Sequence, residues 1–396
     1  MTDIRRIQDA EVAGKRVLVR VDFNVPMKDG AVTDDTRLKA ALPTIEHLKQ
    51  AGARTVLLAH FGRPKGQRVD EMSLEPVAQP LADLLGDPVD FVDDITGADA
   101  LEAVSDMSDG DVLLIQNTRF EAGEEKNDPA FAEALAKLGD VYVNDAFSAA
   151  HRAHGSTEGV AKHLPAYAGL SMQREIDHLV QALEAPERPV VALVGGAKVS
   201  TKIELLENLV KKVDVLFVGG GMANTLLHAK GVNVGASLCE KDLADTARAI
   251  LAAAETAGCQ LILPNDALVA TEFKPHPETR LTSVNDVAEN EMILDCGPAT
   301  ITALAVAMDG AKTVIWNGPL GAFETPPFDT ATVTAAKHVA DLAREGEIVA
   351  VAGGGDTVAA LNQAGVADDF TFISTAGGAF LEWMEGKALP GVEALR

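Results

Sequence analysis

Cysteine is scarce in this chain of 396 residues, which has only Cys239, Cys259 and Cys296 and no C-x-x-C pair. Neither a disulfide framework nor a zinc-finger spacing is therefore available, and we expect inert, partly buried thiols. No run approaches the roughly 18 apolar residues of a membrane-spanning helix. The first ten residues also lack the apolar segment of a signal peptide. These absences predict a cytoplasmic protein.

Basic and aromatic residues are also few. The chain has 34 Lys and Arg against 59 Asp and Glu, a net charge of -25, and aromatics make up 4% of it. An acidic surface repels nucleic acid and anionic membranes, and few rings are present on which bases could stack. The acidity is uneven, because residues 70–145 carry 3 basic against 20 acidic side chains while residues 1–69 carry 13 against 8. We therefore expect a small cationic site inside an acidic shell.

The remaining composition is that of a globular protein with two or three domains. Short apolar runs, each stopped by Gly, Asn, Asp or Pro and followed by a helical pattern, predict βα units and parallel sheets. The runs are 16–21, 55–59, 89–92, 112–115 and 141–143, then 190–194, 215–218, 261–263, 313–315, 348–352 and 371–373. Apolar spacing over 172–183 predicts one helix, and prolines 186 and 189 end it at a plausible hinge. We expect domains 1–171 and 190–385, joined by a helix and hinge at 172–189.

Ligands of parallel α/β sheets bind at the carboxyl ends of the strands. In the first half, Arg, His, Asn or Asp follow the runs at 20–26, 60–64, 117–120 and 144–147, the last leading to 151–154. A single arginine there is usually a solvated surface group. Four successive strand ends with such residues, together with Arg37, favour a binding site for a small polyanion. We call these strand-end segments tips. His151 and His154 lack a third ligand candidate, so metal binding there is disfavoured.

In the second half, the segments that follow the runs are 195–202, 219–221, 264–266, 316–319, 353–357 and 374–378, and most of them contain glycine. Each pair of glycines could simply form a tight turn. Accompanied by Lys198, Lys202, Asp356 and Thr375, the turns favour nucleotide phosphates held by backbone N–H groups. Asp356 could approach Mg²⁺ on those phosphates. Neither a G-x-x-x-x-G-K-[ST] loop nor a G-x-G-x-x-G fingerprint is present.

These tips resemble the phosphoglycerate kinase family over essentially the whole chain. The resemblance rests on RVDFNVP at 20–26, HFGRP at 60–64, HRAHGS at 151–156, GGAKVSTK at 195–202, WNGPLGAFE at 316–324 and GGGDT at 353–357. It implies two α/β domains facing across a cleft, each a doubly wound, mostly parallel sheet of about six strands flanked by helices. Residues 386–396 would return to pack on the first domain, and the chain would be a monomer.

The resemblance also implies site residues. The phosphoglycerate site would comprise Asp22, Phe23, Asn24, Arg37, His60, Phe61, Gly62, Arg63, Arg119 and Arg152. The nucleotide site would comprise Lys198, Lys202, Asn317, Glu324, Gly354, Gly355, Asp356, Thr357, Thr375, Gly377 and Gly378, with Asp356 nearest Mg²⁺. Many family members have STGGG where this chain has Ser374-Thr375-Ala376-Gly377-Gly378. A methyl group at Ala376 is tolerable if that residue keeps a negative φ.

The implied reaction is reversible phosphoryl transfer between 1,3-bisphosphoglycerate with MgADP and 3-phosphoglycerate with MgATP. We expect Arg37, Lys198 and Lys202 to act on the transferring group after hinge closure. Two other classes share a two-lobed architecture. A dehydrogenase would need the missing dinucleotide fingerprint, and an exported solute-binding protein would need a signal peptide.

Overall fold

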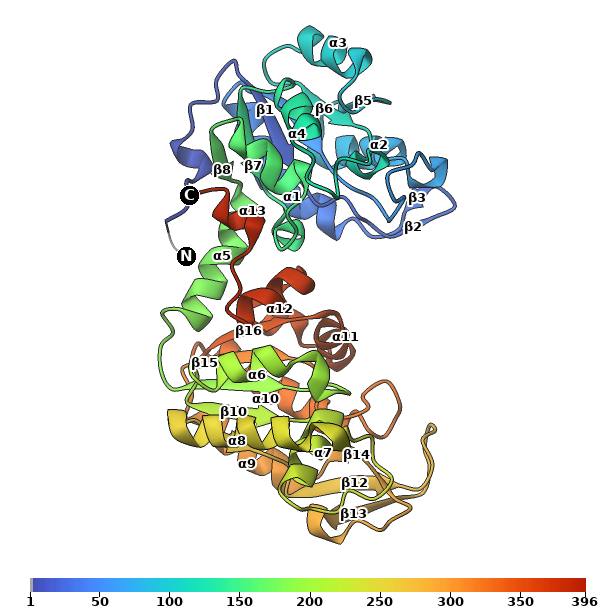
Figure 1. Ribbon diagram of the computed structural model, residues 1–396, viewed down its shortest axis with the longest axis vertical. Coiled ribbons are helices and arrows are strands. Elements are labelled where there is room, and N and C mark those ends of the chain that lie inside the picture. Colours follow the sequence, from blue (N-terminus) through green and yellow to red (C-terminus); the bar gives the residue numbers. More distant parts are fainter. Residues whose placement is uncertain (1–2) are drawn as a thin grey trace. The chain divides into compact units, whose positions relative to one another are not determined.

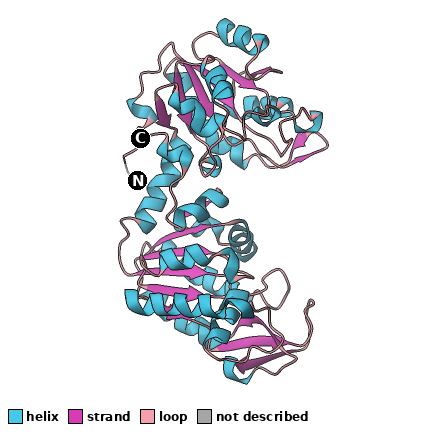
Figure 2. Cartoon of the chain, viewed as in Figure 1, coloured by secondary structure: helices cyan, strands magenta, loops and turns pink. Residues whose placement is uncertain are grey.

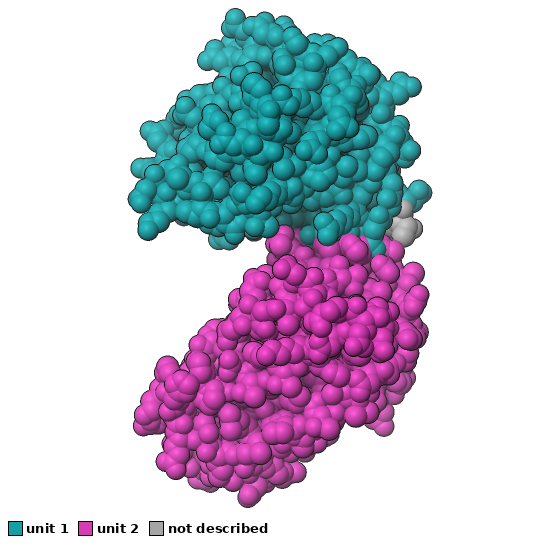
Figure 3. Space-filling model, turned by 180° about the vertical axis from the view of Figure 1, so that it is seen from behind, with its two compact units in different colours: residues 1–177, 388–396 teal, residues 178–387 magenta. Residues whose placement is uncertain are grey.

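The computed structural model describes residues 3–396 and divides the chain into two compact units. Unit 1 consists of two segments, the chain up to Asp177 and Ala388–Arg396, and unit 2 spans His178–Lys387 (Figure 3). The boundary lies inside helix α5 (Leu170–Leu183), which is the helix expected over 172–183. No helix among the described residues is long and apolar enough to cross a membrane.

Unit 1 is built on a six-stranded parallel sheet with the order β5-β6-β4-β1-β7-β8 (Figure 1). The strands are β1 (Arg16–Arg20), β4 (Arg54–Leu58), β5 (Asp90–Val92), β6 (Val112–Ile115), β7 (Val141–Asn144) and β8 (Ala166–Ala168). Its helices are α1 (Thr36–Gln50), α2 (Glu75–Leu85), α3 (Ala98–Asp106) and α4 (Pro129–Ala136), and β2 (Met27–Lys28) pairs with β3 (Ala31–Val32). The central strands β1, β4, β6 and β7 are buried almost throughout because both faces of a parallel sheet are covered.

Unit 2 repeats this plan of a sheet flanked by helices (Figure 2). Its strand order is β11-β10-β9-β15-β16-β17. The strands are β9 (Val190–Val194), β10 (Val215–Val218), β11 (Gln260–Ile262), β15 (Thr313–Asn317), β16 (Val349–Gly353) and β17 (Phe372–Ser374). The helices are α6 (Ile203–Leu209), α7 (Gly220–Ala229), α8 (Ala244–Ala257), α9 (Pro298–Asp309), α10 (Thr330–Arg344), α11 (Gly355–Ala364) and α12 (Gly378–Met384). Every expected apolar run overlaps a strand, and the α/β class with two parallel sheets of six strands is confirmed.

Several strands were not expected from the sequence. In unit 1 these are β8 and the two-residue strands β2 and β3. Unit 2 also contains a separate antiparallel sheet of β12 (Asp266–Ala270), β13 (Thr279–Ser283) and β14 (Met292–Cys296), with β12 in the middle. Strand β13 is mostly exposed, so its polar sequence gave no apolar run.

The C-terminal segment belongs to unit 1. Helix α13 (Pro390–Glu393) lies beside the region that follows β7 (Figure 1). The Gly391 N–H donates to the Ala150 carbonyl (2.8 Å), and the Asn144 side-chain amide donates to the Gly391 carbonyl (3.2 Å). At the other end, the Arg5 N–H donates to the Leu395 carbonyl. These bonds join the two ends of the chain to the same sheet.

Candidate functional site

The first half of the predicted site gathers at one edge of the unit 1 sheet. Arg20 is the last residue of β1, His60 follows β4, and Arg119 lies in the short 3-10 helix after β6. Because β6, β4 and β1 are consecutive parallel strands, their carboxyl ends meet at the same edge. Three cationic or titratable side chains that are distant in the sequence therefore become neighbours.

An ion pair links the loop after β1 to the first turn of α1. The Arg37 Nη1 donates to Asp22 Oδ2 at 2.7 Å and to Oδ1 at 2.9 Å. Asp22 Oδ1 also accepts from the Asn24 N–H, and Asn24 Oδ1 accepts from the Gly62 N–H at 2.9 Å. The predicted residues Asp22, Asn24, Arg37 and Gly62 are thus brought together by one network.

A buried asparagine that sequence reasoning did not assign holds the next loop in place. Asn117 Oδ1 accepts from the Phe61 and Arg119 N–H groups, and its amide nitrogen donates to the Phe61 carbonyl at 2.7 Å. The Arg119 guanidinium in turn donates to the Gly62 carbonyl at 2.8 Å. Gly62 has a φ of +62°, and a Cβ there would lie 2.8 Å from Met72 Sδ, so glycine is favoured at this position.

The edge of the sheet carries a concentrated positive charge. The pKa of Arg119 is lowered to about 10, mainly by burial and also by the charges of Arg20 and Arg152. The Glu125 carboxylate opposes this shift. Burial and the nearby arginines also lower the pKa of His154 to about 4, and they lower the pKa of His60 well below its ordinary value. A guanidinium group buried beside other arginines favours the binding of a small anion.

Not every predicted residue presents its side chain to this cluster. Phe23 is fully buried in the core of unit 1, so it could meet a ligand only through its backbone. Arg63 is exposed. Arg152 is half-buried, and its Nε lies 3.1 Å from His151 Nε2.

In unit 2, Lys202 anchors the glycine turns at the strand ends. Its Nζ donates to the carbonyl oxygens of Gly195 (2.7 Å) and Asn317 (3.1 Å), at the ends of β9 and β15. Burial lowers the pKa of Lys202 to about 8, and the Asp356 carboxylate opposes that shift. Since an ammonium group has three N–H donors, one is left for an anion beside the turns.

The loop after β15 approaches the start of α11. The Asn317 amide nitrogen donates to the Gly353 carbonyl (2.8 Å), and the Gly318 N–H donates to Thr357 Oγ1 (2.7 Å). Asn317 Oδ1 is buried and has no hydrogen-bond partner among the described residues. An unpartnered buried oxygen is costly, and a bound ligand could satisfy it.

The remaining residues of the predicted nucleotide site lie at the surface. Gly354 is partly exposed, and seven others are exposed: Lys198, Glu324, Gly355, Asp356, Thr375, Gly377 and Gly378. Asp356 lies in the first turn of α11. Ala376 is buried and is not among the residues with positive φ, which meets the condition set for its methyl group.

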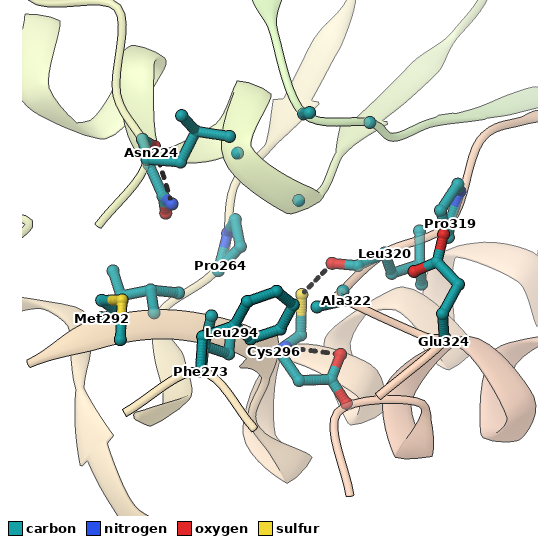
Figure 4. A pocket seen from close by; sticks show the side chains of 18 of the residues that line it. Asn224, Pro264, Phe273, Met292, Leu294, Cys296, Pro319, Leu320, Ala322 and Glu324 are labelled. Carbon is teal, nitrogen blue, oxygen red and sulfur yellow. Dashed lines mark hydrogen bonds between the residues drawn. The ribbon is translucent and has the colours of Figure 1, made fainter. Parts of the chain in front are cut away.

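Next to these turns is a cavity of about 380 Å³ within unit 2 (Figure 4). Its apolar lining includes Leu238, Pro264, Phe273, Met292, Leu294 and Leu320, and its polar lining includes Glu324 and Asp356. Cys296 forms part of the wall, where its Sγ approaches the Leu320 carbonyl and its N–H donates to Asp295 Oδ1. Apolar walls with a few convergent polar groups are typical of a small-ligand site. Sequence reasoning missed these apolar residues because they come from separate strands and loops.

Comparisons with known proteins identify the family of this chain. The family model described as phosphoglycerate kinase matches residues 7–387. The chain belongs to the phosphoglycerate kinase family. It is 75% identical over 395 residues to the phosphoglycerate kinase of Maricaulis maris, covering 100% of this chain and 98% of the relative. It is 65% identical over 391 residues to that of Caulobacter vibrioides, covering 99% of both chains.

A solved structure supports the same assignment. The phosphoglycerate kinase of Coxiella burnetii superposes with a TM-score of 0.93 at 42% identity, covering 99% of this chain and 98% of that chain. Membership of the family makes this chain a kinase, a phosphotransferase whose acceptor is a carboxyl group. The dehydrogenase and solute-binding alternatives are thereby excluded.

Proposed function

We propose that this chain transfers a phosphoryl group reversibly between 1,3-bisphosphoglycerate with MgADP and 3-phosphoglycerate with MgATP. Unit 1 would hold the phosphoglycerate and unit 2 the nucleotide. The observation that carries the proposal is the cationic edge of unit 1, where burial and neighbouring arginines lower the pKa of Arg119 to about 10. An anionic phosphate or carboxylate would relieve that repulsion.

The phosphoglycerate would be held by side chains and backbone groups from several strand ends. Arg119, Arg152 and Arg63 would neutralise its phosphate and carboxylate charges, since guanidinium forks match such oxygens. Asp22 would accept a hydrogen bond from its hydroxyl group, and the Asn24 amide nitrogen would donate one to it. His60 and the loop around Gly62 would complete the contacts.

The nucleotide would place its apolar base in the cavity of unit 2 and its phosphates on the glycine turns. Glu324, which lines the cavity, is suited to bind ribose hydroxyls. Gly354, Gly355 and Thr357 begin α11, where backbone N–H groups and the helix dipole favour phosphate. The segment of Thr375, Gly377 and Gly378 offers further N–H groups.

Magnesium would enter with the nucleotide. Mg²⁺ usually takes one or two protein carboxylates and fills its other positions with phosphate oxygens and water. Asp356, exposed in the first turn of α11, fits that requirement. When bound, the ion would neutralise charge on the phosphates.

Phosphoryl transfer asks the chain mainly to position groups and stabilise charge. In the direction of ATP consumption, a 3-phosphoglycerate carboxylate oxygen bonds to the γ-phosphorus, and the bond from that phosphorus to the β–γ bridging oxygen breaks. The acceptor oxygen is already anionic, so no general base is needed. Arg37 would donate to the transferring group from the phosphoglycerate side, and Lys202 with Lys198 from the nucleotide side.

The two proposed sites lie on different units, so transfer requires the units to bring their substrates into contact. We propose that a hinge near 172–189 allows this closure, which would also exclude water. Solution scattering should show contraction when both substrates are bound to a monomer. An unchanged radius of gyration would count against closure.

A coupled assay tests the proposed reaction. Purified protein, ATP, 3-phosphoglycerate and Mg²⁺ are combined with a dehydrogenase that consumes 1,3-bisphosphoglycerate, and cofactor oxidation is followed by absorbance. Activity should require all three small molecules. Failure of 3-phosphoglycerate to support turnover would overturn the assignment. Fractionation of the source cells would test the expected cytoplasmic location.

A further inference from the structure

Arg20 is a fully buried arginine that the proposed reaction does not use. It ends β1, and its guanidinium donates in three directions. Its Nε donates to Ser156 Oγ at 2.8 Å, its Nη1 to the Val21 carbonyl at 2.5 Å, and its Nη2 lies 2.9 Å from His60 Nδ1. The side chain therefore cannot rotate without leaving a buried polar group unpaired.

The contact with His60 determines how that ring is protonated. A guanidinium group has only N–H donors, so Nδ1 of His60 must accept. A neutral imidazole carries one hydrogen, and here that hydrogen has to be on Nε2. His60 is 8% exposed, and its Nε2 makes no hydrogen bond to a described residue. The free N–H is thus available to a ligand.

A buried carboxylate compensates the charge of Arg20. Ser156 Oγ, which accepts from Arg20, donates its own proton to Glu124 Oε1 at 2.5 Å, and the Ser156 N–H donates to Glu124 Oε2 at 2.8 Å. Glu124 is 0% exposed. Glu124, Ser156, Arg20 and His60 thus form one continuous hydrogen-bonded network. Buried hydrogen-bonded networks of this kind hold their members rigidly.

We propose that Arg20 is a positioning residue that fixes His60 as the neutral tautomer with its hydrogen on Nε2, so that His60 donates a hydrogen bond to an anionic oxygen of phosphoglycerate. The identity of that ligand rests on the proposed function, whereas the tautomer does not.

Other charges at this edge of the sheet support the neutral state. Burial lowers the pKa of His60, and the nearby cationic or titratable groups Arg20, Arg119, Arg152 and His154 all lower it further. The ring should therefore stay neutral throughout the usual range of histidine titration, between about pH 5 and 8.

The first experiment measures the tautomer in the full chain without substrate. Nitrogen-15 correlation spectra of the histidine side chains distinguish a ring with its hydrogen on Nε2 from one with it on Nδ1 and from imidazolium. His60 is assigned as the signal missing from His60→Gln. We expect the Nε2 hydrogen and no titration between about pH 5 and 8. A hydrogen on Nδ1, or a ring that protonates in this range, would overturn the proposal.

The second experiment separates positioning from general stability. Arg20→Lys keeps the positive charge, but its single nitrogen cannot take the place of the three guanidinium nitrogens that bond Ser156, Val21 and His60, so His60 should become a mixture of tautomers. The KM for 3-phosphoglycerate should rise about threefold to tenfold, the value of one hydrogen bond, with the KM for ATP unchanged. Arg16→Lys is the matched control, because Arg16 begins the same strand and pairs with exposed Asp140. An unchanged tautomer in Arg20→Lys would refute the positioning role.

The two measurements also separate this inference from the proposed function. The wild-type protein could carry the His60 hydrogen on Nε2 and yet not use 3-phosphoglycerate. That result would refute the proposed ligand and confirm the proposed tautomer. Activity combined with the wrong tautomer would refute only the role of Arg20. If Arg20→Lys does not fold, the wild-type spectrum alone decides.

Discussion

Arg37, in the first turn of α1, and Asp22, just beyond β1, form an ion pair 2.7 Å long. Both hydrogen bonds come from one nitrogen of Arg37, Nη1. The pair is partly exposed, with 34% and 15% of the two side chains accessible. Asp22 thus orients the guanidinium group, while its Nε and Nη2 make no bond to this carboxylate and are left for an anion.

Replacing Arg37 by alanine should lower kcat about 10²–10³-fold, the usual cost of losing one donor to a transition state. The coupled assay at saturating ATP and 3-phosphoglycerate measures this loss. Arg16→Ala is a control that removes another arginine paired with an aspartate, and it should change kcat little. Near wild-type kcat in Arg37→Ala would remove Arg37 from the proposed chemistry.

The pKa of Lys202 predicts an alkaline limit for nucleotide use. Because burial lowers that pKa to about 8, the ammonium group of the free enzyme loses its proton as the pH rises above that value. The kcat/KM for ATP should then fall about tenfold per pH unit. Lys202→Arg keeps its charge to much higher pH.

The pH profile of Lys202→Arg is the internal comparison. Its overall activity should be lower, because the longer, planar group fits the Gly195 and Asn317 carbonyls poorly. However, its kcat/KM for ATP should not fall near pH 8. An identical alkaline limb in both proteins would assign the titration to another group.

Gly318 is predicted to tolerate no side chain. Its φ is +102°, and a Cβ there would lie 2.2 Å from the Gly195 carbonyl oxygen and 2.9 Å from Lys202 Nζ. Gly318→Ala should therefore cost at least about 2 kcal/mol of stability and raise the KM for ATP. Urea unfolding and the coupled assay measure these effects.

The control for this prediction is Gly310→Ala. Gly310 ends α9 with a φ of -85°, and a Cβ there would lie 3.8 Å from its nearest neighbour, the Ala307 carbonyl oxygen. This variant should have wild-type nucleotide kinetics and nearly wild-type stability. Equal effects at the two glycines would contradict the steric explanation.

Asp145 should make the fold less stable as the pH rises. Its Oδ1 accepts from the Ser171 and Met172 N–H groups at the start of α5, and its Oδ2 has no partner among the described residues. Burial raises its pKa from 3.8 to about 7. The folded state therefore binds more protons than the unfolded state between these values, and its stability falls as the pH rises through about 7.

Asp145→Asn keeps the accepting oxygen and places an uncharged amide where Oδ2 lies. We expect this variant to gain about 1–3 kcal/mol relative to the wild type between pH 5 and 8, measured by urea unfolding. Asp140→Asn should have the opposite effect, because Arg16 lowers the pKa of Asp140. The ionised Asp140 stabilises the fold, so this variant should be less stable than the wild type at pH values above that pKa. A pH-independent difference at Asp145 would contradict its raised pKa.

Sequence patterns predicted the strands well because each is a short apolar run between breakers. They did not predict β8 or the antiparallel sheet of β12, β13 and β14, of which β13 is mostly exposed and polar. They also indicated candidate site residues, because His60 and Lys202 stand out chemically after strands and Arg37 stands out in the first turn of α1, and these assignments stay predictions. They did not assign Asn117, whose role comes only from the backbone groups of Phe61 and Arg119 that surround it.

The sequence by itself determined the α/β class, the family and the types of residue at the strand ends, because these depend on local pattern and on motifs such as RVDFNVP and GGGDT. Only the tertiary structure decided which of those residues meet. Arg20 contacts His60 because β1 and β4 are neighbours in the sheet, and Lys202 reaches Asn317 because β9 pairs with β15. Hydrogen bonding, burial and hence protonation depend on such neighbours, and strand order is not written in any local stretch of the chain.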